Sequence, residues 1–112
     1  MNSSTIAPSA YVALKAAFKG TRNVKVTDWG GTISVVYFET PILLIGQDGT
    51  FIDNGGFKTV TTKKHLNTAL LAAHVAASVR QTKGVWLVTT GGRETAFFRH
   101  FPIATVRLPI AA

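Results

Sequence analysis

The sequence lacks cysteine altogether and is poor in acidic residues. Without cysteine, the chain has no disulfide bonds, thiolate nucleophiles, iron–sulfur clusters or cysteine-based zinc sites. Its five Asp and Glu residues stand against twelve Lys and Arg, which gives a formal net charge of +7 at pH 7. A positive field of this kind favours anionic partners, nucleic acid among them. The same charge also occurs on basic proteins in which it only maintains solubility.

Long apolar runs are absent too. No stretch approaches the roughly 18 consecutive apolar residues that a membrane-spanning helix requires. Residues 1–7 lack the basic start and the apolar centre of a secretory signal. We therefore expect no membrane association and a cytoplasmic location.

The composition is typical of one folded domain. The chain has 112 residues, of which 46% are hydrophobic and 15% are charged. This balance favours a packed core over disorder. We expect a single domain over residues 1–112, divided into an N-terminal helix extension (1–22), a core (23–98) and an extended tail (99–112).

A helix is predicted near the amino terminus. Ser9 is a suitable N-cap, and Gly20 suits the left-handed conformation that often ends a helix. Tyr11, Leu14 and Phe18 then fall on one helix face, because they are spaced three and four residues apart. We expect this face to pack on a sheet; a helix that contacts a partner is the alternative.

Short β-rich segments follow, separated by turns rich in Gly, Asp and Asn. Turns are expected at residues 28–31, 47–49 and 53–56. The strands between them are residues 24–27, 32–38, 41–45 and 50–52, in the order of an antiparallel meander. Pro41 has no N–H to donate to a neighbouring strand, so it belongs at a strand start or on a sheet edge.

The second half of the sequence combines one helix with further strands. Apolar residues recur at helical spacing through residues 63–78, with Thr61 or Thr62 as the N-cap. Residues 79–82 and 85–90 are predicted strands joined through Lys83 and Gly84, and a Gly-Gly turn leads into residues 94–98. The predicted fold class is α+β: an N-terminal helix, an antiparallel β-meander, one central helix packed on the sheet, a C-terminal β-hairpin and an extended apolar tail.

The tail, residues 101–112, is apolar but contains Pro102 and Pro109, which prevent a regular helix through it. Two interpretations remain open. The tail packs along its own domain, or it adds a strand to a neighbouring subunit in a homo-oligomer. In the second case the partner-binding residues are Phe101, Ile103, Val106, Leu108 and Ile110.

Two motifs resemble a group of small, mostly uncharacterised bacteriophage proteins. The first, residues 38–42, is Phe-Glu-Thr-Pro-Ile, and the second, residues 54–63, is Asn-Gly-Gly-Phe-Lys-Thr-Val-Thr-Thr-Lys. A later Gln81-x-Lys83-Gly84-x-Trp86-x-Val88 also matches, so the similarity covers about residues 38–98 and leaves the first helix and the tail outside. The resemblance implies a phage origin, and therefore an infected bacterial host, but no particular activity or ligand.

The second motif also has a structural explanation that needs no ligand. Asn54, Gly55 and Gly56 tolerate positive φ and suit a tight turn. Phe57 is then expected to insert into the core, and residues 61–62 to begin the helix.

The start of the second predicted helix is the most suggestive candidate site. Lys63, Lys64 and His65 lie at the N-terminal end of this helix, where their charge is repelled by the partial positive charge of the helix end. A bound anion would be attracted both by these side chains and by the helix end. Residues 54–93 contain no acidic residue that could neutralise them locally. The candidate nucleic-acid or anion-binding residues are Lys58, Thr61, Thr62, Lys63, Lys64, His65, Arg80 and Lys83.

Aromatic residues near these cations could stack on unpaired bases. The candidates are Trp29, Phe57, Trp86, Phe97 and Phe98. Most are expected in the core. Trp29 is the exception, because it lies in a predicted turn, and we take it as the best stacking contact for a base or a protein partner.

Enzymatic interpretations have little support. The carboxylates fall mainly in turns, where they usually bind nearby backbone, and none pairs convincingly as acid and base. His65, His74 and His100 lack the spacing and the neighbours of a zinc site, and no glycine-rich phosphate loop is present. We expect no enzyme, cofactor or metal. The expected function is a small basic phage binding module that contacts nucleic acid; the alternative is a phage factor that binds a host protein or assembles with itself.

Overall fold

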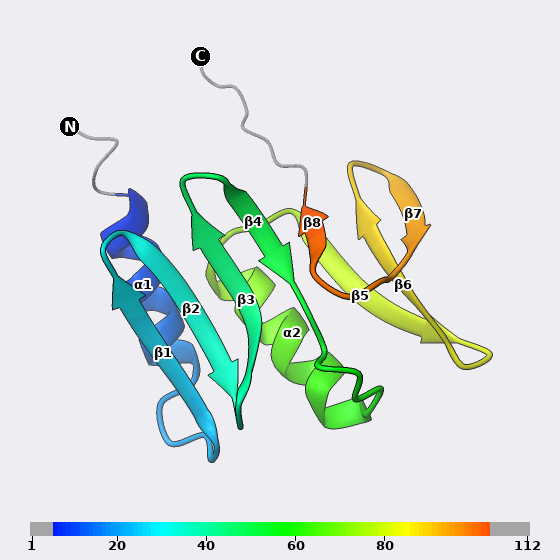
Figure 1. The fold of residues 1–112 in the computed structure, drawn as a ribbon, viewed down its shortest axis with the longest axis horizontal. Coiled ribbons are helices and arrows are strands. Elements are labelled where there is room, and N and C mark those ends of the chain that lie inside the picture. Colours follow the sequence, from blue (N-terminus) through cyan, green and yellow to red (C-terminus); the bar gives the residue numbers. More distant parts are fainter. Residues whose placement is uncertain (1–5, 104–112) are drawn as a thin grey trace.

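The computed structural model describes residues 6–103, which form two helices and eight strands (Figure 1). In chain order they are α1 (Ile6–Ala17), β1 (Val24–Trp29), β2 (Thr32–Tyr37), β3 (Thr40–Gly46), β4 (Gly49–Ile52), α2 (Val60–Ala72), β5 (Ala77–Thr82), β6 (Val85–Thr90), β7 (Arg93–Ala96) and β8 (Phe101–Ile103). A five-stranded sheet has the order β1-β2-β3-β4-β8, and a three-stranded sheet has the order β5-β6-β7. All strand pairs are antiparallel, so the α+β class is confirmed.

The meander is confirmed as well. β1 to β4 pair consecutively, and the β1–β2 and β3–β4 turns fall within the predicted turns at residues 28–31 and 47–49. The β2–β3 turn at residues 38–39 was not predicted, because residue 38 was expected to end a strand. Pro41 is the second residue of β3, close to the strand start where its missing N–H is tolerated. Opposite it, the register shifts between Val35 and Val36, which leaves Ile42 without a partner across the strand pair.

β8 returns the chain to the first sheet. It follows the hairpin of β6 and β7 but pairs with β4, so that Ile52 lies opposite Phe101. Asp53 holds this return in place, because its carboxylate accepts hydrogen bonds from Arg99 Nε at 2.6 Å, from Arg99 Nη2 at 3.0 Å and from the backbone N–H of His100 at 3.3 Å. The side chain of Asp53 is only 6% exposed. Its partners therefore satisfy a carboxylate that would otherwise be buried alone.

The core lies between the helices and one face of the five-stranded sheet (Figure 1). Leu14 and Phe18 of α1 are buried and Tyr11 packs beside them, so the predicted apolar face of the first helix is confirmed. The largest fully buried side chains are Leu14, Ile33, Val35, Ile42, Leu43, Ile52, Leu66, Leu70 and Val88. No helix within residues 6–103 is long and apolar enough to cross a membrane.

Three predicted helix boundaries were wrong. α1 begins at Ile6, so Ser9 lies inside the helix and is not its N-cap. α2 begins at Val60, and its N-cap is Thr59, which displaces both Thr61 and Thr62 from that role. α2 also ends at Ala72, well before residue 78, because the chain reverses at His74 with a φ of 58°.

The early end of α2 has a tertiary cause. The alanine-rich segment after it is compatible with a helix by spacing, but residues 77–78 pair with β6 instead, where Ala77 lies opposite Thr90. The hairpin that follows turns at Lys83 and Gly84, both with positive φ, as predicted from the sequence. Strand pairing has overridden local helix preference.

Candidate functional site

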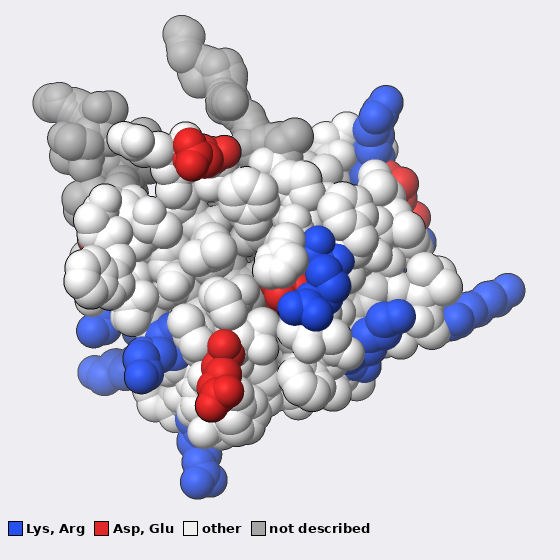
Figure 2. Space-filling model, in the orientation of Figure 1, with Lys and Arg blue, Asp and Glu red and all other residues white. Residues whose placement is uncertain are grey.

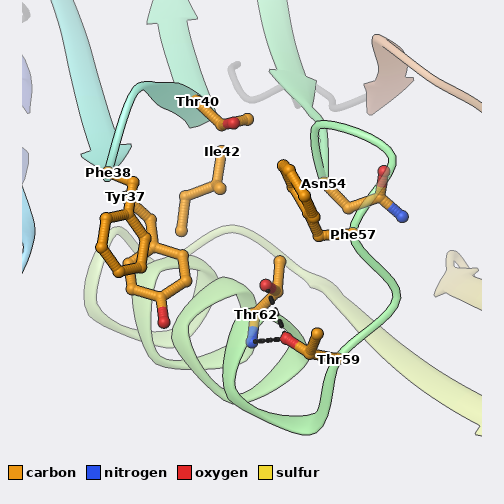
Figure 3. Close-up of a pocket in the computed structure, with 8 residues that line it drawn as sticks. All are labelled: Tyr37, Phe38, Thr40, Ile42, Asn54, Phe57, Thr59 and Thr62. Atoms are coloured by element: carbon orange, nitrogen blue, oxygen red, sulfur yellow. Dashed lines mark hydrogen bonds between the residues drawn. The ribbon is translucent and has the colours of Figure 1, made fainter.

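The two motif segments, residues 38–42 and 54–63, meet at one pocket (Figure 3). The pocket has a volume of about 210 Å³ and lies between the β2–β3 turn, the loop after β4 and the start of α2. Its lining residues are Tyr37, Phe38, Thr40, Ile42, Asn54, Phe57, Thr59 and Thr62. Segments separated in the sequence thus build a single recess.

The turn that forms one wall depends on glycine. Gly55 and Gly56 have φ of 64° and 85°, and the N–H of Gly56 donates to Asn54 Oδ1 at 2.8 Å. A Cβ on Gly55 would lie 2.4 Å from Thr40 Oγ1, closer than two such atoms can approach. The predicted tight turn is therefore confirmed, and it lies directly against the start of β3.

Two aromatic rings stand on opposite sides of the pocket (Figure 3). Phe38, in the β2–β3 turn, is 64% exposed, and Phe57 is 63% exposed. The prediction that Phe57 inserts into the core was wrong. The turn at Asn54 closes with a hydrogen bond from the Phe57 N–H at 2.9 Å, and this directs the ring to the surface beside the recess.

The floor of the pocket near α2 consists of threonines that bind each other. Thr59 Oγ1 accepts from the N–H of Thr62 at 3.1 Å and lies 2.9 Å from the Thr62 hydroxyl. Thr62 is only 2% exposed, so its hydroxyl belongs to the helix cap rather than to the surface. Thr61 is exposed on the first turn.

α2 and β5 run antiparallel, which brings distant cations to one end of the molecule. Asn67 of α2 contacts Val79 of β5, and Lys63 Nζ, closer to the helix start, donates to Gln81 Oε1 at 3.3 Å. The start of α2 therefore lies beside the end of β5. Lys83, which follows β5, lies at that end.

Four lysines belong to the segments at this end of the molecule: Lys58 precedes α2, Lys63 and Lys64 lie in its first turns, and Lys83 follows β5. Lys58, Lys64 and Lys83 are exposed, and Lys63 is half-buried. Within residues 6–103 no ion pair involves any of the four. In the view of Figure 2, the side chains above the five-stranded sheet are largely uncharged, and Lys and Arg project mainly from the rim of the molecule.

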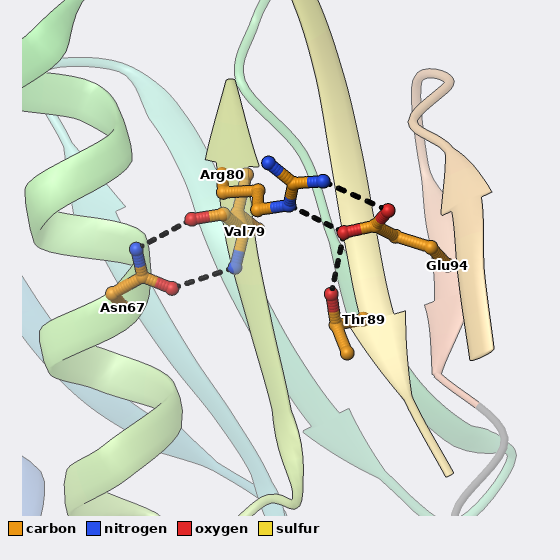
Figure 4. Close-up of polar contacts among 5 residues, drawn as sticks. All are labelled: Asn67, Val79, Arg80, Thr89 and Glu94. Carbon is orange, nitrogen blue, oxygen red and sulfur yellow. Dashed lines mark hydrogen bonds and ion pairs between the residues drawn. The ribbon is translucent and has the colours of Figure 1, made fainter. Parts of the chain in front are cut away.

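Arg80 differs from these lysines because it is neutralised. Its Nε and Nη2 atoms both donate to the carboxylate of Glu94, which also accepts from the Thr89 hydroxyl at 3.4 Å (Figure 4). The hydrogen bond from Arg80 lowers the pKa of Glu94 below its usual value. Glu94 lies one residue beyond the acid-free segment of the sequence, and the strand arrangement brings it back to Arg80.

His65 packs among aromatic rings. Its ring centroid lies 4.7 Å from that of Tyr37 and 5.8 Å from that of Phe18, both in edge-on contacts. Burial, with a smaller effect of the neighbouring Lys64 charge, lowers the pKa of His65 below its ordinary value. This shift favours the neutral imidazole, which packs against Tyr37 and Phe18.

Trp29 is exposed, as predicted, with 81% of its surface accessible. It ends β1 at the β1–β2 turn, however, and that turn lies at the opposite end of the sheet from the β2–β3 turn (Figure 1). Of the other aromatic candidates, Trp86 is buried, Phe97 is half-buried against it and Phe98 is 54% exposed. Trp29 and the four lysines do not share a surface.

The tail residues divide into two groups. Phe101 and Ile103 are 6% and 4% exposed, because β8 places them in the core of the chain's own sheet. Up to residue 103, the tail packs along its own domain. Val106, Leu108 and Ile110 lie outside the described residues. Within residues 6–103, no group of three or more His, Asp and Glu side chains is arranged to hold a metal ion.

The fold and the pocket therefore define a small α+β protein with a surface recess beside a basic helix start. A family model described as the Kyanoviridae Gp96 protein matches residues 3–104, and the chain belongs to this family. The phage origin is thus confirmed. The match is wider than residues 38–98 and includes the first helix, which we had expected to lie outside the similarity. Neither a curated protein nor a solved structure matches the chain.

Proposed function

We propose that this phage protein is a non-enzymatic binding module that holds nucleic acid against the start of α2. One observation carries the proposal. Four lysines without a carboxylate partner, Lys58, Lys63, Lys64 and Lys83, lie at the same end of the molecule as two exposed aromatic rings. Cations that track a backbone beside rings that stack on bases are the combination that sequence-independent nucleic-acid binding uses.

The contact set is narrower than the sequence indicated. Arg80 already has Glu94 as its partner, and His65 and Thr62 are engaged in packing and capping. We therefore assign them no phosphate contact. Thr61 remains available on the exposed side of the first turn. Phe38 and Phe57 replace Trp29 as the proposed stacking residues.

The expected salt dependence follows from the number of lysines. Each cation that neutralises a phosphate of a single strand contributes about 0.7 to the slope of log affinity against log salt, so four contribute about 3. The binding of a fluorescein-labelled oligonucleotide, followed by anisotropy between low and moderate salt, measures this slope directly.

Matched charge variants provide the control. Lys58→Ala with Lys64→Ala removes two exposed cations of the proposed surface, and the slope should fall by about 1.4. Lys15→Ala with Arg93→Ala removes the same charge from exposed positions on α1 and at the start of β7. The control pair should leave the slope unchanged. Equal losses in both pairs, or no binding at low salt, would reject the proposal.

A protein partner is the second candidate function. It is favoured by the exposed apolar side chains around the start of α2, because Val60, the first residue of the helix, is 73% exposed and Phe57, three residues before it, is 63% exposed. Acidic regions of a host protein would be attracted by the same lysines. Capture of a purified candidate host protein that persists after nuclease treatment, and is lost with Phe57→Ala, would favour this function.

Self-assembly through the tail has a separate test. Phe101 and Ile103 already serve the chain's own sheet, so an assembly contact would rest on Val106, Leu108 and Ile110. Truncation after Ile103 should convert an oligomer to monomers, measured by light scattering, without changing the melting temperature. An unchanged mass would exclude the tail as the assembly element.

A further inference from the structure

We propose that the pocket between Phe38 and Phe57 takes one unpaired nucleobase, so that the protein prefers single-stranded to duplex nucleic acid. This inference rests on the proposed function, because it assumes that nucleic acid binds at the start of α2. It adds the form of the ligand and the residues that would select it.

The shape of the pocket suits a flat apolar group. Phe38 and Tyr37 stand on one side, Phe57 stands on the other, and Ile42 lies between them (Figure 3). The recess of about 210 Å³ is open to the surface. A nucleobase has two π faces that stack on aromatic rings, and this stacking tolerates any base. A base inside a duplex must first be unpaired and unstacked at a cost of a few kcal/mol, which disfavours double strands at this pocket.

The polar groups of the pocket are compatible with the edge of a base. The hydroxyls of Thr59 and Thr62 bind each other at the helix cap. Thr40, on the opposite wall, makes no side-chain hydrogen bond to another residue of the described chain, and its hydroxyl can both donate and accept. One hydroxyl available to a ligand, in a recess whose other threonine hydroxyls bind each other, provides orientation without strict sequence specificity.

A second, shallower groove continues from the pocket and gives the strand a path. The two share Phe38, Thr40 and Phe57, and the groove extends across the start of β1 to Lys25. A strand that inserts one base in the pocket would have the lysines of α2 on one side and Lys25 on the other. The charge that complements its phosphates is thus present in both directions. Glu39, which also lines the groove, can accept a hydrogen bond from an exocyclic amino group of cytosine.

The test compares strand form and aromatic residue. The probes are a labelled 12-nucleotide oligothymidylate and a labelled duplex of the same length. Phe57→Ala should weaken binding of the single strand by about 5- to 150-fold, which is the loss of one stacked base, and should leave the salt slope unchanged. Phe57→Tyr, which keeps the ring, should restore binding. Trp29→Ala removes an aromatic ring that is 81% exposed at the other end of the sheet, and it should have no effect.

Each result bears on the inference. Preference for the single strand together with a selective loss in Phe57→Ala supports it. If the duplex binds as tightly as the single strand, and Phe57→Ala behaves like Trp29→Ala while the lysine variants still reduce the salt slope, the base pocket and the stacking role of Phe57 are wrong. Nucleic-acid binding through the lysines at the start of α2 then stands. If neither probe binds at low salt, both are rejected. Circular dichroism melting of each variant separates a lost contact from a lost fold.

Discussion

Asn67 is predicted to be one of the most sensitive polar residues of the fold. β5 is the edge strand of the three-stranded sheet, so the backbone groups on its outer side have no strand partner. The side chain of Asn67 takes that place, because its Nδ2 donates to the carbonyl of Val79 at 2.8 Å and its Oδ1 accepts from the Val79 N–H at 2.7 Å (Figure 4). Val79 itself is only 3% exposed. Water therefore cannot readily replace the amide.

The size of the effect follows from these two contacts. Asn67→Leu preserves the approximate volume but leaves one buried donor and one buried acceptor unsatisfied, each at a cost of about 1 to 3 kcal/mol. We expect the free energy of unfolding to fall by about 2 to 6 kcal/mol, a large share of the 5 to 15 kcal/mol typical of a domain. The melting temperature should fall by about 4 °C for each kcal/mol in a chain of this size.

Urea denaturation and amide hydrogen exchange measure the two consequences separately. The amide of Val79 should exchange faster in the variant, because its acceptor is gone. Gln47→Leu is the matched control, since Gln47 is an exposed amide in the β3–β4 turn, and it should change stability by less than about 0.5 kcal/mol. If Asn67→Leu changes the free energy of unfolding by less than about 0.5 kcal/mol and the Val79 amide exchanges at the same rate as before, the edge of β5 does not depend on this side chain.

Further predictions concern the turn, the buried carboxylate and the surface ion pair. Gly55→Ala should destabilise the fold strongly, because the new Cβ would collide with Thr40 Oγ1 at a positive φ, and thermal melting would detect this; an unchanged melting temperature would mean that the turn can shift. Asp53→Asn should lower the free energy of unfolding by about 1 to 3 kcal/mol, measured in urea, because the buried side chain loses its charge and one of its two acceptor oxygens and turns an NH2 donor towards the donors of Arg99 and His100. Burial raises the pKa of Asp53, but hydrogen bonds, chiefly from Arg99, outweigh it and leave that pKa below its usual value. The resulting stability is present above the unfolded pKa of about 3.9 and is lost as pH falls through the folded value, so acid should destabilise the natural protein more than Asp53→Asn; parallel acid curves would contradict this. Glu94→Gln should have little effect on stability, since its ion pair is exposed, and a loss above about 1 kcal/mol in urea would contradict this assignment.

Local sequence signals predicted much of the fold. The meander followed from glycine-rich turns and β-branched segments, and the packed face of α1 followed from the spacing of Leu14 and Phe18. These features depend on residues close together in the chain. The end of α2 depends instead on the pairing of Ala77 with Thr90, and the return of β8 depends on its pairing with β4. These residues are separated in the sequence, so no local pattern encodes their contacts.

The candidate site was predictable only in part. The lysines near the start of α2 were found from charge alone, but the pairing of Arg80 with Glu94 required two strands on either side of β6. The pocket was missed because its walls come from two motifs that are separated in the sequence and meet only in the folded chain. Their shared content of aromatic and threonine residues was the available signal. The exposure of Phe57 could not be foreseen, since an aromatic residue after a turn is buried in many folds.

The return of β8 to β4 also constrains how the protein assembles during synthesis. β4 pairs with β8 only after Phe101 has been synthesised and can lie opposite Ile52. Until then a nascent chain presents the N–H and C=O groups of β4 to any other extended segment, the situation in which strands from different copies associate. We therefore expect deletion of β8 to promote aggregation through the exposed edge of β4.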